Sequence, residues 1–260
     1  SIKKNLRLIQ PNNLKEIDFI NELKLINADI FIVVAFRMLP KVIWEIPKKG
    51  TINLHASLLP QLRGAAPIHW AIIEGLKKTG VTTFFINEKI DFGNIIEQKE
   101  VEIEDFENTG NLYEKLKKIG SLLLLSTLEL INENKFQITK QSNSEGFLNA
   151  PKLNRANTRI DWNKSGLKIF NMVRGLSPHP SAWTTSEKTG KILKLYNVIF
   201  IKEKKSIGLN GLININNNLI KVYVKDGYLQ IKELQIEGKK RMNSSEFANG
   251  FKNYNSTKLI

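Results

Sequence analysis

The chain has 260 residues, 42% of them hydrophobic and 25% charged, and it contains no cysteine. The apolar fraction is sufficient for the cores of one large or two ordinary domains, and the lack of cysteine excludes disulfides and thiolate-bound metals. Positive charge is concentrated in residues 155–260, where 19 Lys and Arg stand against 7 Asp and Glu, a net +12, whereas residues 1–154 have a net charge of +2.

The first half of the chain alternates between helical and extended patterns. Residues 13–26 carry apolar side chains at helical spacing. Residues 29–36 form a nearly continuous apolar run, which is typical of a parallel strand covered on both faces. Such alternation predicts an α/β sheet, which binds its ligands at the carboxyl ends of the strands. Further strands are expected at residues 50–55, 81–86 and 95–103, and further helices at residues 67–76 and 111–131.

The strand expected at residues 50–55 runs into a loop that carries polar chemistry. Asn53 and His55 are two residues apart, so in an extended segment their side chains lie on the same side. An amide can donate a hydrogen bond to a developing oxyanion and an imidazole can carry a proton, which favours acyl-type transfer. A lone carboxylate, Asp91, follows later, just before Gly93. Taken singly, each would more often be structural: Asn53 a loop cap, His55 a polar residue at a strand end and Asp91 a turn residue. Taken together with the Ser-Leu-Leu-Pro loop, they favour a catalytic site.

The second half of the chain has a different pattern. Residues 137–159 lack periodicity and are rich in Asn and Ser, as an interdomain linker would be. A helix is expected from an N-cap at Asn163 to Gly175. Beyond Ser181 short alternating strands, with turns at residues 188–190 and 225–227, predict a small antiparallel barrel. We therefore expect a catalytic domain over residues 1–136, a linker over 137–154 and a second domain over 155–260.

The polar loop resembles the formyltransferases that use 10-formyltetrahydrofolate, whose signature is Asn-x-His-x-Ser-Leu-Leu-Pro followed by an Asp before a Gly. Residues 53–60 and Asp91 match this signature. Within that superfamily, residues 63–68, 174–180 and 234–242 look most like the methionyl-tRNA formyltransferases. The resemblance covers nearly the whole chain.

The resemblance implies a Rossmann-like, mostly parallel sheet, with its first strands and a basic loop lying before Ser1, followed by an antiparallel barrel of the oligonucleotide-binding (OB) type. It implies formyl transfer from 10-formyltetrahydrofolate to initiator methionyl-tRNA without a metal. Asn53 would donate to the oxyanion, His55 would carry the proton, and Asp91 would hold the imidazole ring. His69 and His179 are expected to be structural. The residues that would contact the folate are Phe36, Arg37, Met38, Leu39, Ser57, Leu58, Leu59 and Pro60.

The basic second half is expected to bind the tRNA, although a lysine-rich solvated surface is the alternative. Lys239, Lys240 and Arg241 form a compact cationic group, with Lys232 and Lys252 nearby in sequence. We expect a monomer in the cytoplasm. We expect no membrane span, because no apolar run approaches the roughly twenty residues that a span needs. The alternative functions are formyl transfer to a nucleotide-sugar amine or to glycinamide ribonucleotide, and non-catalytic RNA binding on an inactive core. The charge asymmetry and residues 234–242 favour tRNA.

Overall fold

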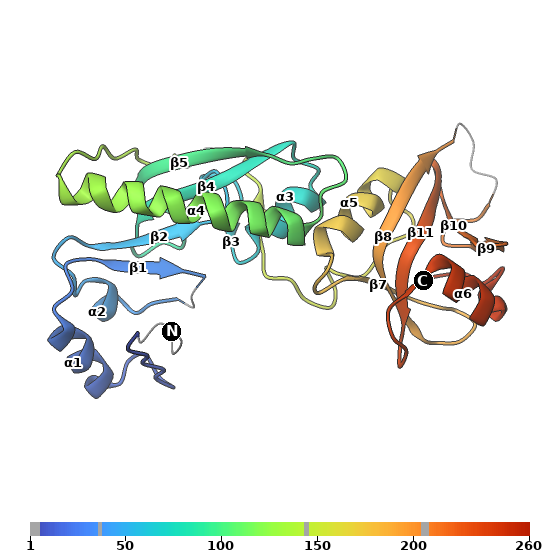
Figure 1. The fold of residues 1–260 in the computed structure, drawn as a ribbon, viewed down its shortest axis with the longest axis horizontal. Helices are drawn as coiled ribbons and strands as arrows, with labels where there is room; N and C mark the ends of the chain where they lie inside the picture. The colour runs from blue at the N-terminus through green and yellow to red at the C-terminus, as the bar shows by residue number, and fades with distance from the viewer. Residues whose placement is uncertain (1–5, 36–37, 143–145, 204–207) are drawn as a thin grey trace.

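The computed structural model describes residues 6–35, 38–142, 146–203 and 208–260, and its two larger β-sheets have four and six strands (Figure 1). The first sheet and its long covering helix lie at one end of the molecule, and the second sheet lies at the other. Shorter helices and an extended segment lie between them. No helix in the described part of the chain is long and apolar enough to cross a membrane.

The first sheet has the strand order β1-β2-β4-β5, with β1 (Phe31–Val34), β2 (Thr51–His55), β4 (Lys78–Phe85) and β5 (Ile95–Glu102). β1 and β2 pair in parallel, whereas β4 is antiparallel to both of its neighbours. The connection over residues 86–94 is a hairpin, too short for the crossover that parallel strands require. The predicted α/β class is confirmed, and within this four-stranded sheet the β1–β2 pairing is parallel whereas the pairings of β4 are antiparallel.

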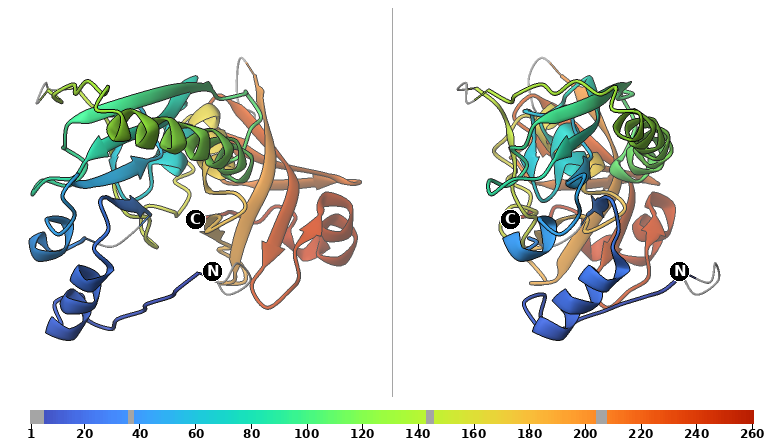
Figure 2. Two further views of the ribbon diagram at one scale, coloured as in Figure 1. Left: turned by 60° about the vertical axis from the view of Figure 1, so that its left-hand side comes forward. Right: turned by 90° about the vertical axis from the view of Figure 1, so that its left-hand side faces the viewer.

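Helices flank this sheet: α1 (Ile17–Ile26), α2 (Lys41–Trp44), α3 (Pro67–Ile73) and α4 (Thr109–Asn132). Pro67 is the first residue of α3, where its missing N–H leaves no bond unmade. The buried residues of α4 include Leu112, Leu116 and Leu123, which recur at helical spacing and pack against Val81 of β4. The helix predicted over residues 111–131 is confirmed, and α4 covers one face of the sheet with this apolar stripe (Figure 2).

The segment after α4 crosses the same sheet on the opposite side (Figure 2). It contains the short strand β6 (Asn149–Ala150), which pairs in parallel with β3 (Arg63–Gly64) in the loop after β2. Thr139 forms a further antiparallel bridge with Ile95 of β5. Part of the predicted linker is thus paired with the first sheet.

The second sheet is antiparallel throughout, with the order β7-β8-β11-β10-β9 and β12 paired with β11. Its path is open between β7 and β9, and the last residues of the chain lie across both edges. Ile260 exchanges two hydrogen bonds with Thr185 at the end of β7, and the Leu259 N–H donates to the Gly211 carbonyl, near the start of β9. The antiparallel pairing that the turn spacing predicts is confirmed, but the described strands do not close into the predicted barrel. The strands are β7 (Ala182–Thr185), β8 (Ile192–Lys202), β9 (Ile213–Asn216), β10 (Leu219–Val224), β11 (Gly227–Ile236) and β12 (Met242–Asn243).

Two helices and a 3-10 turn accompany the second sheet: α5 (Gly166–Leu176), α6 (Ser244–Gly250) and Lys252–Tyr254. The predicted N-cap at Asn163 is wrong: the helix begins after Ser165, whose hydroxyl accepts a hydrogen bond from the Lys168 N–H. Ser165 has the extended backbone that an N-cap requires, so the helix starts there.

Helix α5 joins the two sheets because it packs on both α3 and β8. The Arg174 guanidinium, near its end, donates to the Glu107 carbonyl at 2.9 Å. Nδ1 of His69 on α3 donates to the Gly175 carbonyl at 2.8 Å. Burial lowers the pKa of both Arg174 and His69. His69 therefore has the structural role that the sequence predicts.

Candidate active site

Strand β2 presents Asn53 and His55 on the face of the sheet opposite α4. Leu54, between them, packs toward α4, because a Cβ atom at Gly120 would lie 3.0 Å from its Cδ2. Alternation along the strand then turns both neighbours to the other face. His55 is buried, with 6% of its surface exposed, and Asn53 is half-buried. The predicted pairing of amide and imidazole on one face is therefore present.

Nε2 of His55 lies 2.9 Å from the Leu62 carbonyl oxygen. A carbonyl oxygen only accepts, so Nε2 carries the proton of the neutral ring and donates it to Leu62. Nδ1 is then the nitrogen with a free lone pair. This nitrogen lies 3.9 Å from Oδ2 of Asp91.

Asp91 approaches the ring without forming a hydrogen bond to it, because 3.9 Å exceeds hydrogen-bond distance. Its Oδ2 instead accepts the Gly64 backbone N–H at 2.9 Å, and its side chain is 13% exposed. Asp91 has a φ of 51°, in the left-handed region that residues other than glycine rarely adopt. The contact between Asp91 and His55 is thus electrostatic, and it strengthens when the ring becomes charged.

The Ser-Leu-Leu-Pro loop is held by hydrogen bonds within the first domain. The Ser57 hydroxyl donates to the Gln61 carbonyl at 2.6 Å, and the Ser57 carbonyl accepts from the Thr82 hydroxyl at 2.6 Å. Leu59 packs against Phe84. The side chains of Ser57 and Leu59 therefore stabilise the loop itself, through a hydrogen bond and through core packing.

The other residues predicted to contact the folate are placed differently. Leu58 and Pro60 are half-buried and Met38 is exposed, so these three have side-chain surface available to a ligand. Leu39 packs against the small apolar cluster around α1 and α2. Phe36 and Arg37 lie outside the described residues.

The residues predicted to bind tRNA lie in the second sheet and near helix α6. Arg241 already has partners within the protein: it forms an ion pair with Glu233 at 2.5 Å, and its guanidinium lies 4.1 Å from the centroid of the Tyr196 ring. Lys239, Lys240 and Lys252 are exposed, and Lys232 is half-buried. The structure therefore leaves the lysines more available to an anion than the arginine.

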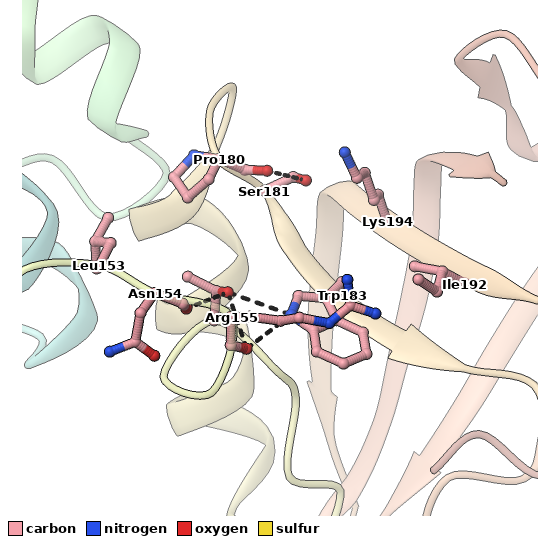
Figure 3. Close-up of a pocket in the computed structure, with 9 residues that line it drawn as sticks. Leu153, Asn154, Arg155, Pro180, Ser181, Trp183, Ile192 and Lys194 are labelled. Carbon is pink, nitrogen blue, oxygen red and sulfur yellow. Dashed lines mark hydrogen bonds between the residues drawn. The ribbon is translucent and has the colours of Figure 1, made fainter.

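A cationic hollow of about 330 Å³ between residues 153–158 and strands β7 and β8 was not predicted (Figure 3). All of its lining residues are neutral or basic, and Arg155 and Lys194 are its cations. The Arg155 guanidinium lies 4.7 Å from the centroid of the Trp183 ring, and the Trp183 Nε1–H donates to the Arg155 carbonyl. The sequence signal is weak, because Arg155 lies in the aperiodic segment 137–159 and Lys194 lies on a strand.

No group of three or more His, Cys, Asp and Glu within the described ranges could hold a metal ion. The arrangement consists of one amide, one imidazole and one carboxylate around a polar face of β2. Such a set can stabilise an oxyanion and move a proton, which are the needs of acyl transfer.

Comparison with known proteins identifies the family. A model described as formyl transferase matches residues 2–128, and one for the formyl transferase C-terminal domain matches residues 152–252. The methionyl-tRNA formyltransferase of Flavobacterium johnsoniae is 48% identical over 96% of this chain and 80% of its own length. That of Parabacteroides distasonis is 42% identical over 97% of this chain and 80% of its own length.

Solved structures agree in fold. HypX from Aquifex aeolicus, in complex with tetrahydrofolic acid, superposes with a TM-score of 0.65 at 21% identity, over 87% of this chain and 39% of the HypX chain. A 4-N formyltransferase from Francisella tularensis superposes with a TM-score of 0.59 at 28% identity, over 69% of this chain and 73% of its own. With two family models and curated relatives above 40% identity, the chain belongs to the methionyl-tRNA formyltransferases.

Proposed function

We propose that this chain transfers the formyl group of 10-formyltetrahydrofolate to the amino group of initiator methionyl-tRNA, giving N-formylmethionyl-tRNA. The relatives that carry this name support the substrates. The observation that carries the chemistry is the placement of Nδ1 of His55 at 3.9 Å from the Asp91 carboxylate, on the face of β2 that also bears Asn53.

The reaction passes through a tetrahedral intermediate. The amino nitrogen of methionine forms a bond to the formyl carbon, whose oxygen becomes an oxyanion. The bond from that carbon to N10 of the folate then breaks. The Asn53 amide donates to the oxyanion, and loss of such a donor costs about 3 kcal/mol in the barrier.

Proton movement falls to His55. Its Nε2–H is engaged by the Leu62 carbonyl, so Nδ1 accepts the proton that the attacking amine loses. The imidazolium formed in this way faces the Asp91 carboxylate, which stabilises it. The same proton then passes to N10 as the folate departs, which leaves His55 neutral for the next cycle.

We place this chemistry in residues 1–136, with residues 137–154 as the linker and residues 155–260 as the tRNA-binding domain. The side chains of Met38, Leu58 and Pro60 have surface available for the folate, while Ser57, Leu59 and Leu39 would shape its pocket through backbone and packing. A monomeric state and a cytoplasmic location stay predictions.

Substrate choice is tested with labelled 10-formyltetrahydrofolate, offered with charged initiator tRNA, a nucleotide sugar bearing an amine and glycinamide ribonucleotide in parallel. We expect label only in the tRNA. Label transferred to the nucleotide sugar instead would support the alternative sugar formyltransferase.

Binding of the tRNA is tested by replacing Lys239, Lys240 and Arg241 together with glutamine. If these residues neutralise phosphates, each loss reduces the salt dependence of tRNA affinity by about one unit of slope, since fewer counterions are released. Folate affinity should stay unchanged. If the slope of tRNA affinity against salt concentration is unchanged, these three residues do not contact the tRNA. The hollow around Arg155 and Lys194 would then be the next candidate for the tRNA contact.

A further inference from the structure

The presumed linker contacts the catalytic loop at several points, and these contacts lie on both sides of the active site. The Leu62 N–H donates to the Leu148 carbonyl at 2.7 Å, and the Leu148 N–H donates to Oε1 of Gln61 at 2.9 Å. Leu62 has a φ of 59°, and its carbonyl is the partner of Nε2 of His55. Residue 148 therefore fixes the group that orients the imidazole.

On the other side, Gln141 contacts the turn that carries Asp91. Its Nε2 donates to the Asp91 carbonyl at 3.1 Å and to the Gly93 carbonyl at 2.8 Å. Its Oε1 accepts from Nε and Nη2 of Arg63, at 3.0 and 2.7 Å. A side-chain amide offers two N–H donors and one oxygen with two lone pairs, so Gln141 uses its full hydrogen-bonding capacity here.

The turn that Gln141 holds has a conformation that needs support. Asp91 lies in the left-handed region, which side chains other than glycine occupy at a cost of order 1–2 kcal/mol. Such a backbone persists only where the surroundings determine it. Gln141 bonds to the two carbonyls on either side of Phe92. It therefore fixes the backbone from which the Asp91 carboxylate projects.

Arg63 connects the turn to the loop after β2. Its guanidinium lies 4.1 Å from the centroid of the Phe92 ring, and it belongs to β3, which pairs with β6. Burial lowers the pKa of Arg63, and the negative charge of Asp91 opposes that change. Gln141 thus joins the strand that follows His55 to the turn that carries Asp91, through one side chain.

We propose that Gln141 is a positioning residue for formyl transfer: it holds the Asp91 carboxylate at the distance from His55 that supports the charged ring. This inference rests on the proposed function. The hydrogen bonds that Gln141 donates go to the Asp91 and Gly93 carbonyls, so it acts through the backbone of residues 91–93. The presumed linker is then a component of the active site as well as a connection between domains.

The test compares Gln141→Met with Gln235→Met in the full chain. Gln235 accepts from the Tyr196 hydroxyl and donates to the Lys239 carbonyl, both at 2.8 Å, so its replacement removes similar bonds far from His55. Displacing a catalytic group by about 1 Å can cost about 100-fold in rate. We expect Gln141→Met to lower kcat by about 10- to 100-fold with KM for both substrates nearly unchanged. Gln235→Met should keep the wild-type kcat, and because Gln235 holds the backbone of the predicted tRNA contact Lys239, any effect of its loss is expected in KM for tRNA.

A third variant separates the two halves of the Gln141 amide. Gln141→Glu keeps an acceptor for Arg63 but has no donor for the carbonyls of residues 91 and 93 when ionised. If positioning depends on those carbonyls, this variant loses kcat as Gln141→Met does. Wild-type turnover in Gln141→Glu would overturn the proposal.

A second measurement needs no substrate. The chain has three histidines, so the ring carbon–proton resonances of His55 can be assigned by mutation. We expect Gln141→Met to shift the His55 signal in the same direction as Asp91→Asn does, with His69 and His179 unmoved. If the wild type fails to formylate tRNA, the proposed function fails while this spectrum still decides the role of Gln141. An unmoved His55 signal, or equal loss of kcat and thermal stability in both Gln→Met variants, would overturn the proposal.

Discussion

Replacing Asp91 with asparagine isolates the charge of the carboxylate. Asparagine has nearly the same shape, and its oxygen can still accept the Gly64 N–H, so the turn is expected to keep its structure. Two unit charges separated by the 3.9 Å between Nδ1 of His55 and Oδ2 of Asp91 attract by about 4 kcal/mol at an effective dielectric constant of about 20. In the transition state, where the ring is charged, loss of this attraction corresponds to about a 1,000-fold lower rate.

The assay is single-turnover formylation of charged initiator tRNA at saturating 10-formyltetrahydrofolate, which measures the chemical step apart from product release. We expect tRNA affinity and the thermal midpoint to stay close to those of the wild type, because the charge acts on the transition state. His55→Ala should lose at least as much activity, since it removes the proton carrier itself.

A rate within about tenfold of the wild type for Asp91→Asn would refute this reasoning, because about 1.4 kcal/mol would then be all that the charge contributes. A large loss of thermal stability in the same variant would show that the carboxylate is needed by the fold instead. Unfolding followed by circular dichroism distinguishes the two outcomes.

Two further predictions concern the loop and the domain junction. Gly64→Ala should destabilise the chain by about 1–3 kcal/mol and lower kcat, because Gly64 has a φ of 124° and a Cβ atom would lie 2.4 Å from the Ala150 carbonyl oxygen. Gly190→Ala is the control, because Gly190 has a φ of 67° and an added Cβ atom would have no other atom within 4 Å; it should cost about 1 kcal/mol of stability and keep kcat. Equal kcat in both variants would contradict the prediction for Gly64→Ala. Burial lowers the pKa of His69, so the unfolded chain binds its proton first as pH falls below 6.5, and stability should fall there by at most about 1.4 kcal/mol per pH unit. His69→Asn should reduce that loss, as measured by thermal midpoints at pH 7.5 and 5.5, and an unchanged pH dependence would show that His69 is not its source.

Local patterns in the sequence were sufficient for the elements and for part of the site. The two-residue spacing of Asn53 and His55 places both side chains on one face, as β2 confirms. The helical stripe of α4 and the proline at the start of α3 also follow from neighbours in the chain. The N-cap of α5 was misplaced by two residues because both Asn163 and Ser165 suit that position, and only the backbone at Ser165 distinguishes them.

Contacts between distant residues were decided by the tertiary structure. The bond of Gln141 to Arg63 joins residues 78 positions apart, and the pairing of β3 with β6 places part of an Asn- and Ser-rich segment against the catalytic loop. This segment has neither helical nor strand periodicity and is rich in Asn and Ser, so its sequence is typical of a linker between domains. The ion pair of Arg241 with Glu233 likewise depends on the pairing of β11 with β12.

The physical reason is the range of the interactions. Helical stripes, strand alternation and caps arise from residues within a few positions of one another, and they leave a signal in any short window of sequence. Hydrogen bonds such as those of Gln141 to Arg63 and to the Asp91 carbonyl join residues far apart in the sequence. They depend on where two segments of backbone meet, which the packing of the whole chain determines. The sequence by itself therefore determined which residues are the candidates for the chemistry, and the tertiary structure decided which distant residues lie against them.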